Sequence, residues 1–573
     1  MPLLPWFLGL VACAPVQDAE PEPLPLLDHA ALTSELARLS SRANVSLHRV
    51  AVSRGGRAVE ALELAAPDLP DDAPALLLVA NLSGPRVFAS SLALDHARRL
   101  AEGGDEARAL LATTRVYIVP RANPDAAEAR FATPRHDHGA SGHGIDDDRD
   151  GRQGEDPPLD LDGDGFVTTL RVEDPEGTWM PDPHDPRVLI EADRSKGQRG
   201  RYRVYTEGRD TDGDERVAED AALDARVDRN FPAGWEHHVG AAGLFPTDEP
   251  EVLGLIEFVL ARPAIALVVC YDRLDNLVKA PKTVKDDARP VKRVPPTGIL
   301  ASDGALLKEL GSRYADATGS KAEGEGSWDG SFSRWCYEHR GLLTLDAALW
   351  NLPSEAPAPP KGEDAEEEEG AEEGDAENAS TDEEPAPKPK GKPSADAKHL
   401  TWIDATGEDW RFRPWTAYEH PELGPCEIGG FAPHARVEPP ASETGALAES
   451  HFAFFVGLGE VLPRLAFESC ELEELGSGLW RVRAVLVNES LLPLLSRSAR
   501  KTRTTRPARV ELVLPDAATL VAGRGTTFVS DLPGSGGRSE HVWLVQGPEG
   551  MELGVRVDSD HAGSLLQRPE VVR

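Results

Sequence analysis

Three short runs of alternating aspartates stand out as residues that could bind a metal ion in this 573-residue chain. Aspartates at alternate positions of a tight loop converge on one point, and calcium prefers such oxygen ligands. The runs therefore predict at least one calcium site, and the alternative is a loop of solvated acidic residues. The twelfth position of an EF-hand starting at Asp160 is Arg171, not glutamate, so we expect shorter calcium loops. The predicted ligands are Asp146, Asp148, Asp150, Asp160, Asp162, Asp164, Asp210, Asp212 and Asp214.

A second candidate metal group is a cluster of histidines in the same region. His136, His138 and His143 lie close together in a glycine-rich stretch. Imidazole nitrogens are common ligands of zinc. Histidines at such spacing in a flexible loop also arise by chance, so an incidental group is the alternative. A metal held there would make hydrolysis of an amide bond possible.

The segments around these clusters alternate between strands and helices. Apolar runs at 76–80, 116–119, 265–270 and 342–350 predict buried strands, and 90–101 predicts an amphipathic helix. This order predicts the α/β class, with a mixed, largely parallel sheet flanked by helices. From about residue 469 the hydrophobic period changes to two, which predicts a small C-terminal all-β sandwich.

Composition and charge limit the possible partners and locations. The net charge of −37 argues against nucleic-acid binding, and the chain has no apolar run long enough to span a membrane. The first residues resemble a signal peptide, and Leu10–Cys13 resembles a lipobox, with an uncleaved apolar tail as the alternative. We therefore expect an exported protein that is periplasmic, extracellular or lipid-anchored through Cys13. Two of the four later cysteines could form a disulfide after export.

Several blocks, taken in order, resemble the M14 family of zinc carboxypeptidases (carboxypeptidase A-like). They are the loop 81–86, the sequence Asn123-Pro124-Asp125, the segment 227–232 and the block 327–350. The resemblance covers roughly residues 30–465 apart from insertions and implies the M14 fold, a bound zinc ion and cleavage of peptide C-termini. Members with such an insertion resemble large secreted bacterial proteins.

The positions that do chemistry in this family are changed. The family loop reads His-Gly-x-Glu, and Ser83 and Arg86 stand at its two zinc-ligand positions. Asp272 stands at the third ligand position, and Ala348 stands where the family has its catalytic glutamate. A zinc peptidase needs a full ligand set and a base that activates water. The resemblance implies zinc, but these residues predict that it is absent and that no catalytic residue is intact.

Two further expectations concern charged residues near this site. The family's Asn-Arg pair binds the carboxylate of the substrate, and Arg229 stands at the Arg position, beside Asp228 in place of Asn. Ligand atoms on a tetrahedral zinc ion are roughly 3–3.5 Å apart, which is also an ion-pair distance. We therefore predict that Arg86 and Asp272 form an ion pair where zinc would have been.

Domain boundaries follow from these patterns. We expect a signal peptide or lipobox, an M14-like domain containing an Asp-rich insertion, a disordered acidic linker, a segment that closes the M14-like domain, and the sandwich. The corresponding ranges are 1–25, 26–352 with the insertion at 136–227, 353–398, 399–467 and 468–573.

Three functions are compatible with the sequence. The first is an exported, catalytically inactive M14-like protein that could bind a peptide or a protein partner. The second is an active metallocarboxypeptidase or amidase with a relocated metal at His136, His138 and His143. The third is a calcium-stabilised surface or assembly protein.

Overall fold

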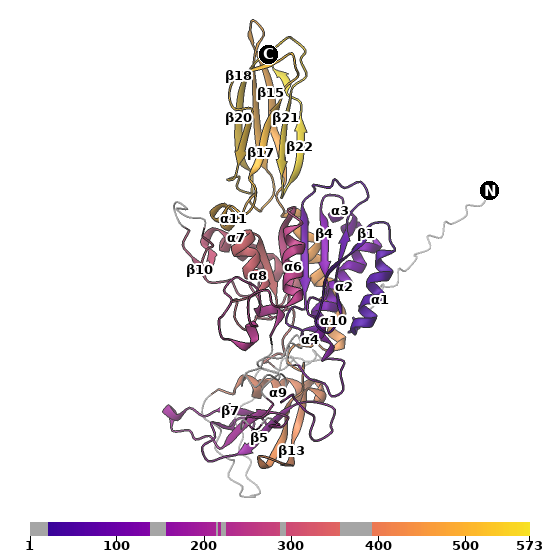
Figure 1. Cartoon of the computed structure of the whole chain (residues 1–573), viewed down its shortest axis with the longest axis vertical. Coiled ribbons are helices and arrows are strands. Elements are labelled where there is room, and N and C mark those ends of the chain that lie inside the picture. The colour runs from indigo at the N-terminus through magenta and orange to yellow at the C-terminus, as the bar shows by residue number, and fades with distance from the viewer. Residues whose placement is uncertain are drawn as a thin grey trace, which may run out of the picture.

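The computed structural model describes residues 21–137, 156–211, 213, 216–218, 225–286, 294–355 and 392–572. Three parts follow one another along the long axis of the molecule (Figure 1). A mixed α/β domain lies in the middle, with a β-sandwich on one side and a smaller sheet-containing part on the other. The predicted fold class is confirmed by these sheets.

The central sheet has six strands in the order β1-β2-β4-β3-β9-β12. The pairs β3–β4, β3–β9 and β9–β12 are parallel, whereas β1–β2 and β2–β4 are antiparallel. Its strands are β1 (Val45–Val52), β2 (Ala58–Leu64), β3 (Ala75–Ala80), β4 (Arg115–Val119), β9 (Ile265–Tyr271) and β12 (Leu343–Ala347).

Both faces of this sheet are buried, which explains why its strands are continuous apolar runs. In β3, Leu76 and Leu78 face one hydrophobic core, and Leu77 and Val79 face the other. The first core includes residues of α1, α2, α3, α7 and α10, and the second includes residues of α6 and α8. These helices are α1 (His29–Ser40), α2 (Val87–Glu102), α3 (Asp105–Leu111), α6 (Pro250–Leu260), α7 (Ala301–Thr318), α8 (Phe332–Trp335) and α10 (Ala441–Gly457).

Short elements connect these parts of the central domain. The helix α4 (Pro124–Glu128) follows β4, and a π-helix (Cys336–Arg340) follows α8. Two short strands, β10 (Thr283–Val284) and β11 (Ile299–Leu300), pair in parallel before α7.

The smaller part combines the Asp-rich insertion with a segment more than two hundred positions later in the chain. Its six strands run in the order β13-β14-β5-β8-β6-β7. The insertion therefore shares its core with the later segment, because residues such as Leu170 pack against Cys426 and Ile428. The strands are β5 (Thr169–Glu173), β6 (Trp179–Pro181), β7 (Leu189–Glu191), β8 (Tyr202–Thr206), β13 (Phe412–His420) and β14 (Gly424–Phe431).

The predicted linker overlaps a helix at its C-terminal end. Helix α9 (Ala395–Thr406) begins within the range 353–398, and Ser394 caps it by accepting a hydrogen bond from the Ala397 amide. The side chains of Leu400, Trp402 and Ile403 on α9 are buried. Residues 356–391 of the predicted linker lie outside the described part of the chain.

The C-terminal part consists of two packed sheets, with strand orders β18-β20-β16-β15-β23 and β19-β17-β21-β22. A core that includes Trp480, Val510 and Trp543 lies between them. The elements are β15 (Leu465–Gly476), β16 (Leu479–Asn488), α11 (Arg497–Thr502), β17 (Ala508–Val513), β18 (Thr519–Ala522), β19 (Thr526–Val529), β20 (Gly537–Gln546), β21 (Gly554–Ser559), β22 (Gly563–Gln567) and β23 (Glu570–Val572).

Two expectations from the sequence concern a disulfide bond formed after export and the absence of a membrane-spanning segment. Cys270, Cys336, Cys426 and Cys470 are all buried and free, so the suggested disulfide between two of them is not formed. Cys270 and Cys336 lie in one core of the central domain, Cys426 in the core of the smaller part and Cys470 in the core of the sandwich. Among the described helices, none has the length and apolar character needed to cross a membrane. Cys13 and the predicted signal peptide up to residue 20 lie outside the described residues.

Candidate functional site

The parallel strands of the central sheet bring the four altered positions to one edge. In the register of the sheet, Ala80 of β3 pairs with Tyr271 of β9, which also pairs with Ala347 of β12. Parallel strands that are in register end at the same edge, and in open α/β sheets ligands bind at this carboxyl edge. The loops carrying Ser83 and Asp272 and the position of Ala348 therefore meet there.

The loop after β3 has a fixed, close-packed shape. Asn81 has a positive φ of 59°, and its side-chain amide donates to the Gly84 carbonyl at 2.6 Å. Gly84 has a φ of 94°, and a Cβ atom there would lie 2.3 Å from the Cβ of Ala126. Only glycine fits this position without a change in the shape of the loop.

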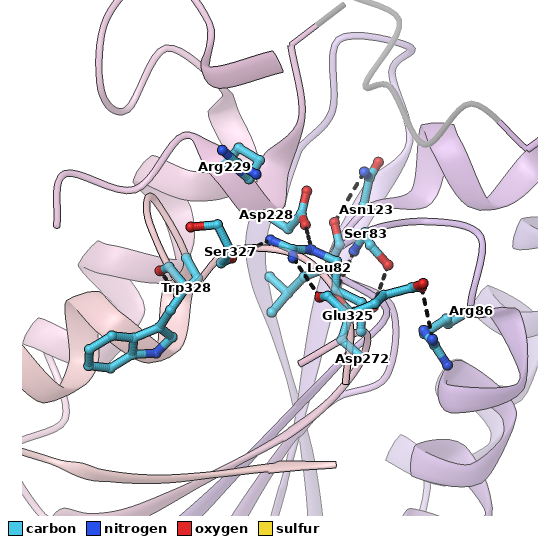
Figure 2. Close-up of polar contacts among 12 residues, drawn as sticks. Leu82, Ser83, Arg86, Asn123, Asp228, Arg229, Asp272, Glu325, Ser327 and Trp328 are labelled. Carbon is cyan, nitrogen blue, oxygen red and sulfur yellow. Dashed lines mark hydrogen bonds and ion pairs between the residues drawn. The ribbon is translucent and has the colours of Figure 1, made fainter. Parts of the chain in front are cut away.

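Ser83 and Asp272 are joined directly by two hydrogen bonds. The Ser83 hydroxyl donates to one carboxylate oxygen of Asp272 at 2.5 Å, and the Ser83 backbone amide donates to the other at 2.9 Å (Figure 2). Burial, together with the nearby charge of Asp228, raises the pKa of Asp272 to about 6, although Ser83, Arg273 and Arg86 oppose the shift. The carboxylate is therefore satisfied within the protein.

Arg86 does not form the predicted ion pair with Asp272; that prediction is wrong. One terminal nitrogen of its buried guanidinium donates to the carbonyls of Ala348 and Trp350, both at 3.0 Å. The other donates to Glu325 at 3.0 Å and to Asn351 at 2.9 Å. These four acceptors bind both terminal nitrogens of Arg86 beyond the end of β12, and Ser83 binds Asp272, so the two side chains have separate partners.

The two charged residues of the predicted carboxylate-binding segment are also paired within the protein. Asp228 accepts a hydrogen bond from Nε of Arg273, the residue that follows Asp272. Arg229 forms an ion pair with Glu236. In Figure 2, Arg229 and Arg86 lie on opposite sides of the Ser83–Asp272 pair. A carboxylate that approached Arg229 would have to compete with Glu236.

A further buried carboxyl group, Asp346, lies on β12 below this edge. It accepts hydrogen bonds from the Ser333 hydroxyl and from the Asn276 amide, and burial raises its pKa to about 7. Together with Asp228 and Asp272 it lines a cavity of about 10 Å³. A single water needs roughly 10–15 Å³, so this cavity has no room for a peptide.

These residues do not fit a catalytic zinc ion. Zinc needs three nitrogen, sulfur or carboxylate ligands around a shared point. The Ser83 hydroxyl and the guanidinium of Arg86 provide hydrogen-bond donors at two of the three positions, and the Asp272 oxygens already accept from Ser83. Among the described residues, no group of three potential ligand side chains includes Asp272. Ala348 supplies no base.

One acidic cluster in the insertion does bring three potential ligands together. Oxygen atoms of Asp160, Asp162 and Glu207 lie within 4.8 Å of one another. Burial raises the pKa of Glu207, whose carboxylate accepts from the amides of Leu161 and Thr168. Asp164, a predicted ligand, is not in this group, and its carboxylate accepts hydrogen bonds from Arg413 and the Phe166 amide.

The remaining predicted metal residues fall largely outside the described chain. Among the predicted calcium ligands these are Asp146, Asp148, Asp150, Asp212 and Asp214, and among the histidines they are His138 and His143. Asp210 is described, and it accepts a hydrogen bond from the Gly213 amide at 2.7 Å. His136 is also described, and one of its ring nitrogens lies 3.3 Å from the Pro134 carbonyl.

Four residues that matter here were missed by the sequence analysis. Glu325 and Asn351 bind Arg86, Arg273 binds Asp228, and Glu207 joins the aspartate cluster. Arg273 had a signal, because an arginine next to a carboxyl group that replaces a ligand can neutralise nearby acids. The other three come from loops or strands whose spacing along the chain does not reveal their contacts.

Two parts of the chain match models of known protein families. Residues 32–158 match the family model described as zinc carboxypeptidase, peptidase M14. This match confirms the predicted M14 resemblance over that part of the chain. Residues 464–568, which contain all strands of the β-sandwich except β23, match a model described as a domain of unknown function. No curated protein matches the chain.

Several solved structures are similar to this chain at low sequence identity. Carboxypeptidase A from Helicoverpa armigera is 14% identical with a TM-score of 0.34, and the match covers 58% of this chain and 66% of that one. Metallo-carboxypeptidase from Burkholderia cenocepacia is 14% identical with a TM-score of 0.30, covering 55% and 59%. Bovine thrombin-activatable fibrinolysis inhibitor is 12% identical with a TM-score of 0.32, covering 56% and 86%.

Proposed function

We propose that this protein is an exported, catalytically inactive relative of the M14 zinc carboxypeptidases. The observation that carries the proposal is the internal pairing of all three former ligand positions. Ser83 bonds to Asp272, and Arg86 bonds to the backbone carbonyls of Ala348 and Trp350. A zinc ion would have to break these bonds and displace a buried cation. Export rests on the sequence of residues 1–25.

Metal content and peptidase activity test this proposal directly. Purified protein, never exposed to chelator, is expected to contain no stoichiometric zinc in elemental analysis. It should also release no C-terminal residue from blocked dipeptides with aromatic, aliphatic or basic ends, with or without added zinc. One zinc per chain, or turnover that a chelator abolishes, would contradict the proposal. Loss of that zinc in a His136→Ala variant would favour the relocated metal site.

A calcium-stabilised surface protein is a second candidate, favoured by the cluster of Asp160, Asp162 and Glu207. A cation there would offset the mutual repulsion of these carboxylates, one of which is buried. It would stiffen the insertion next to β5 and β8. This role is compatible with a former zinc site that binds no zinc.

Calcium binding has its own expected result. If the cluster binds calcium, a calcium concentration of 100 times the Kd stabilises the folded protein by about 2.7 kcal/mol. Calcium should then raise the melting temperature of chelator-treated protein, and an Asp160→Asn variant should lose most of the shift. Asp105→Asn, which changes an exposed carboxylate on α3, is the matched control. An identical melting temperature with calcium and with chelator would rule this site out.

A further inference from the structure

One cleft outside the former zinc site lies between the central domain and the smaller sheet. It has a volume of about 500 Å³, within the range of roughly 300–1,000 Å³ typical of small-molecule sites. Pro85 and Glu325 of the central domain form one side, and residues from β5, β6, β8, β13 and β14 form the other. The cleft therefore adjoins Arg86 but is made mostly by the insertion and by the segment after residue 411.

Aromatic side chains line the apolar part of this cleft. They are Trp179, Phe412, Trp415 and Phe431. The guanidinium of Arg171 lies 4.0 Å from the ring centre of Trp415, and the indole nitrogen donates to the Arg187 carbonyl at 2.7 Å. Phe412 and Phe431 pack edge to face at 5.2 Å. Trp415, Phe412 and Phe431 are thus held in place before any ligand arrives.

Charged side chains at the cleft are already paired with one another. Arg436 makes two hydrogen bonds to Asp396, at 2.5 and 3.0 Å, and Arg187 makes two to Asp404, at 3.0 and 2.6 Å. Both arginines remain about half-exposed. Since a guanidinium has five N–H donors and a carboxylate about four acceptor sites, each pair keeps donors and acceptors to offer.

The same pairing disfavours a strongly charged ligand. An anion at Arg436 or Arg187 would compete with a carboxylate that already binds in bidentate geometry. Glu325, the exposed acid on the opposite side, is paired with Arg86. The cleft therefore offers rigid aromatic surface together with fixed donors and acceptors whose charges are largely cancelled.

We propose that this cleft binds a neutral saccharide. The C–H face of a sugar ring is polarised by its C–O bonds and packs on the negative face of an aromatic ring. Its hydroxyls both donate and accept, so they match a rim that presents guanidinium donors and carboxylate acceptors together. This inference goes beyond the loss of catalysis and does not depend on it.

A proline-rich peptide is the other ligand that commonly uses aromatic grooves, and the rim distinguishes the two. Proline has no backbone N–H, so such a peptide supplies acceptors for the arginines but few donors for Asp396, Asp137 and Glu325. All three carboxylates line the cleft. A saccharide satisfies both kinds of group.

Titration calorimetry of the full chain tests the proposal with cellotriose, maltotriose and triacetylchitotriose, and with decaproline as the peptide probe. At least one trisaccharide is expected to bind. Its affinity should fall about five- to tenfold in a Trp415→Ala variant, the size of one aromatic contact. An Asp396→Asn variant, which keeps the shape of the side chain but breaks the charge pair, should also weaken binding.

The matched control is Phe528→Ala, which removes an exposed aromatic ring from the β-sandwich and should leave the affinity unchanged. Melting temperatures establish that each variant is folded; if Trp415→Ala is not, Trp179→Ala replaces it. The proposal is overturned if none of the three trisaccharides binds, if decaproline binds instead, or if the cleft variants bind as well as the unaltered protein.

Discussion

Replacement of Arg86 by alanine is expected to destabilise the protein by about 3–5 kcal/mol, the usual cost of removing one member of a buried charged network. The guanidinium donates to the carbonyls of Ala348 and Trp350 and to Asn351 and Glu325. Without it, the two buried carbonyls lose a donor and a cavity opens at the start of α2. An unpaired buried polar group alone costs about 1–3 kcal/mol.

Chemical unfolding of Arg86→Ala and of the unaltered protein measures this difference. Arg108→Ala is the control, because Arg108 is an exposed arginine on α3 whose partner Asp105 is also exposed. That substitution should change the free energy of unfolding by no more than about 1 kcal/mol. Arg86→Lys should fall between them, since an ammonium group cannot reach all four acceptors as a planar guanidinium does. Similar losses for Arg86→Ala and Arg108→Ala would show that Arg86 does not hold this edge together.

The sequence predicted the central sheet well because its signal is local. Leu76–Ala80 is an apolar run bounded by a turn, and such a run in an alternating strand–helix order leaves few topologies. The meeting of Ser83 and Asp272 at one edge follows from the parallel register of β3 and β9. These inferences need only strand identity and direction.

The contacts of the site could not be predicted in the same way. Whether Arg86 binds Asp272 or the carbonyls of Ala348 and Trp350 depends on how two loops fold above the sheet. The pairing of β5 with β14 joins segments more than two hundred positions apart. The sequence of neither strand indicates which other strand it pairs with. Glu207 lies beside Asp160 because an isolated bridge pairs Pro158 with Gly208, a contact that the spacing along the chain does not reveal.

Asp272→Asn is expected to stabilise the protein at pH 8 by about 3 kcal/mol and to leave its stability unchanged near pH 4. The pKa of Asp272 is raised from 3.8 to about 6 in the folded protein, and each pKa unit corresponds to about 1.4 kcal/mol. Well below pH 3.8 the carboxyl group is protonated in both the folded and the unfolded state, so no charge is buried on folding. Between pH 4 and 6 the unfolded chain releases its proton first, so the folded state loses stability as pH rises.

Asparagine can replace the hydrogen bonds of Asp272 without carrying its charge. Its carbonyl oxygen can accept from the Ser83 amide, and its NH₂ group can donate to the Ser83 hydroxyl, which rotates to accept. The measurement is the difference in unfolding free energy between variant and unaltered protein from pH 4 to pH 8, with Asp105→Asn as the exposed control. A difference that stays flat across this range would mean that Asp272 ionises as a solvated aspartate does. Destabilisation at pH 8 would mean that its negative charge is needed, as it would be if a cation were bound beside it.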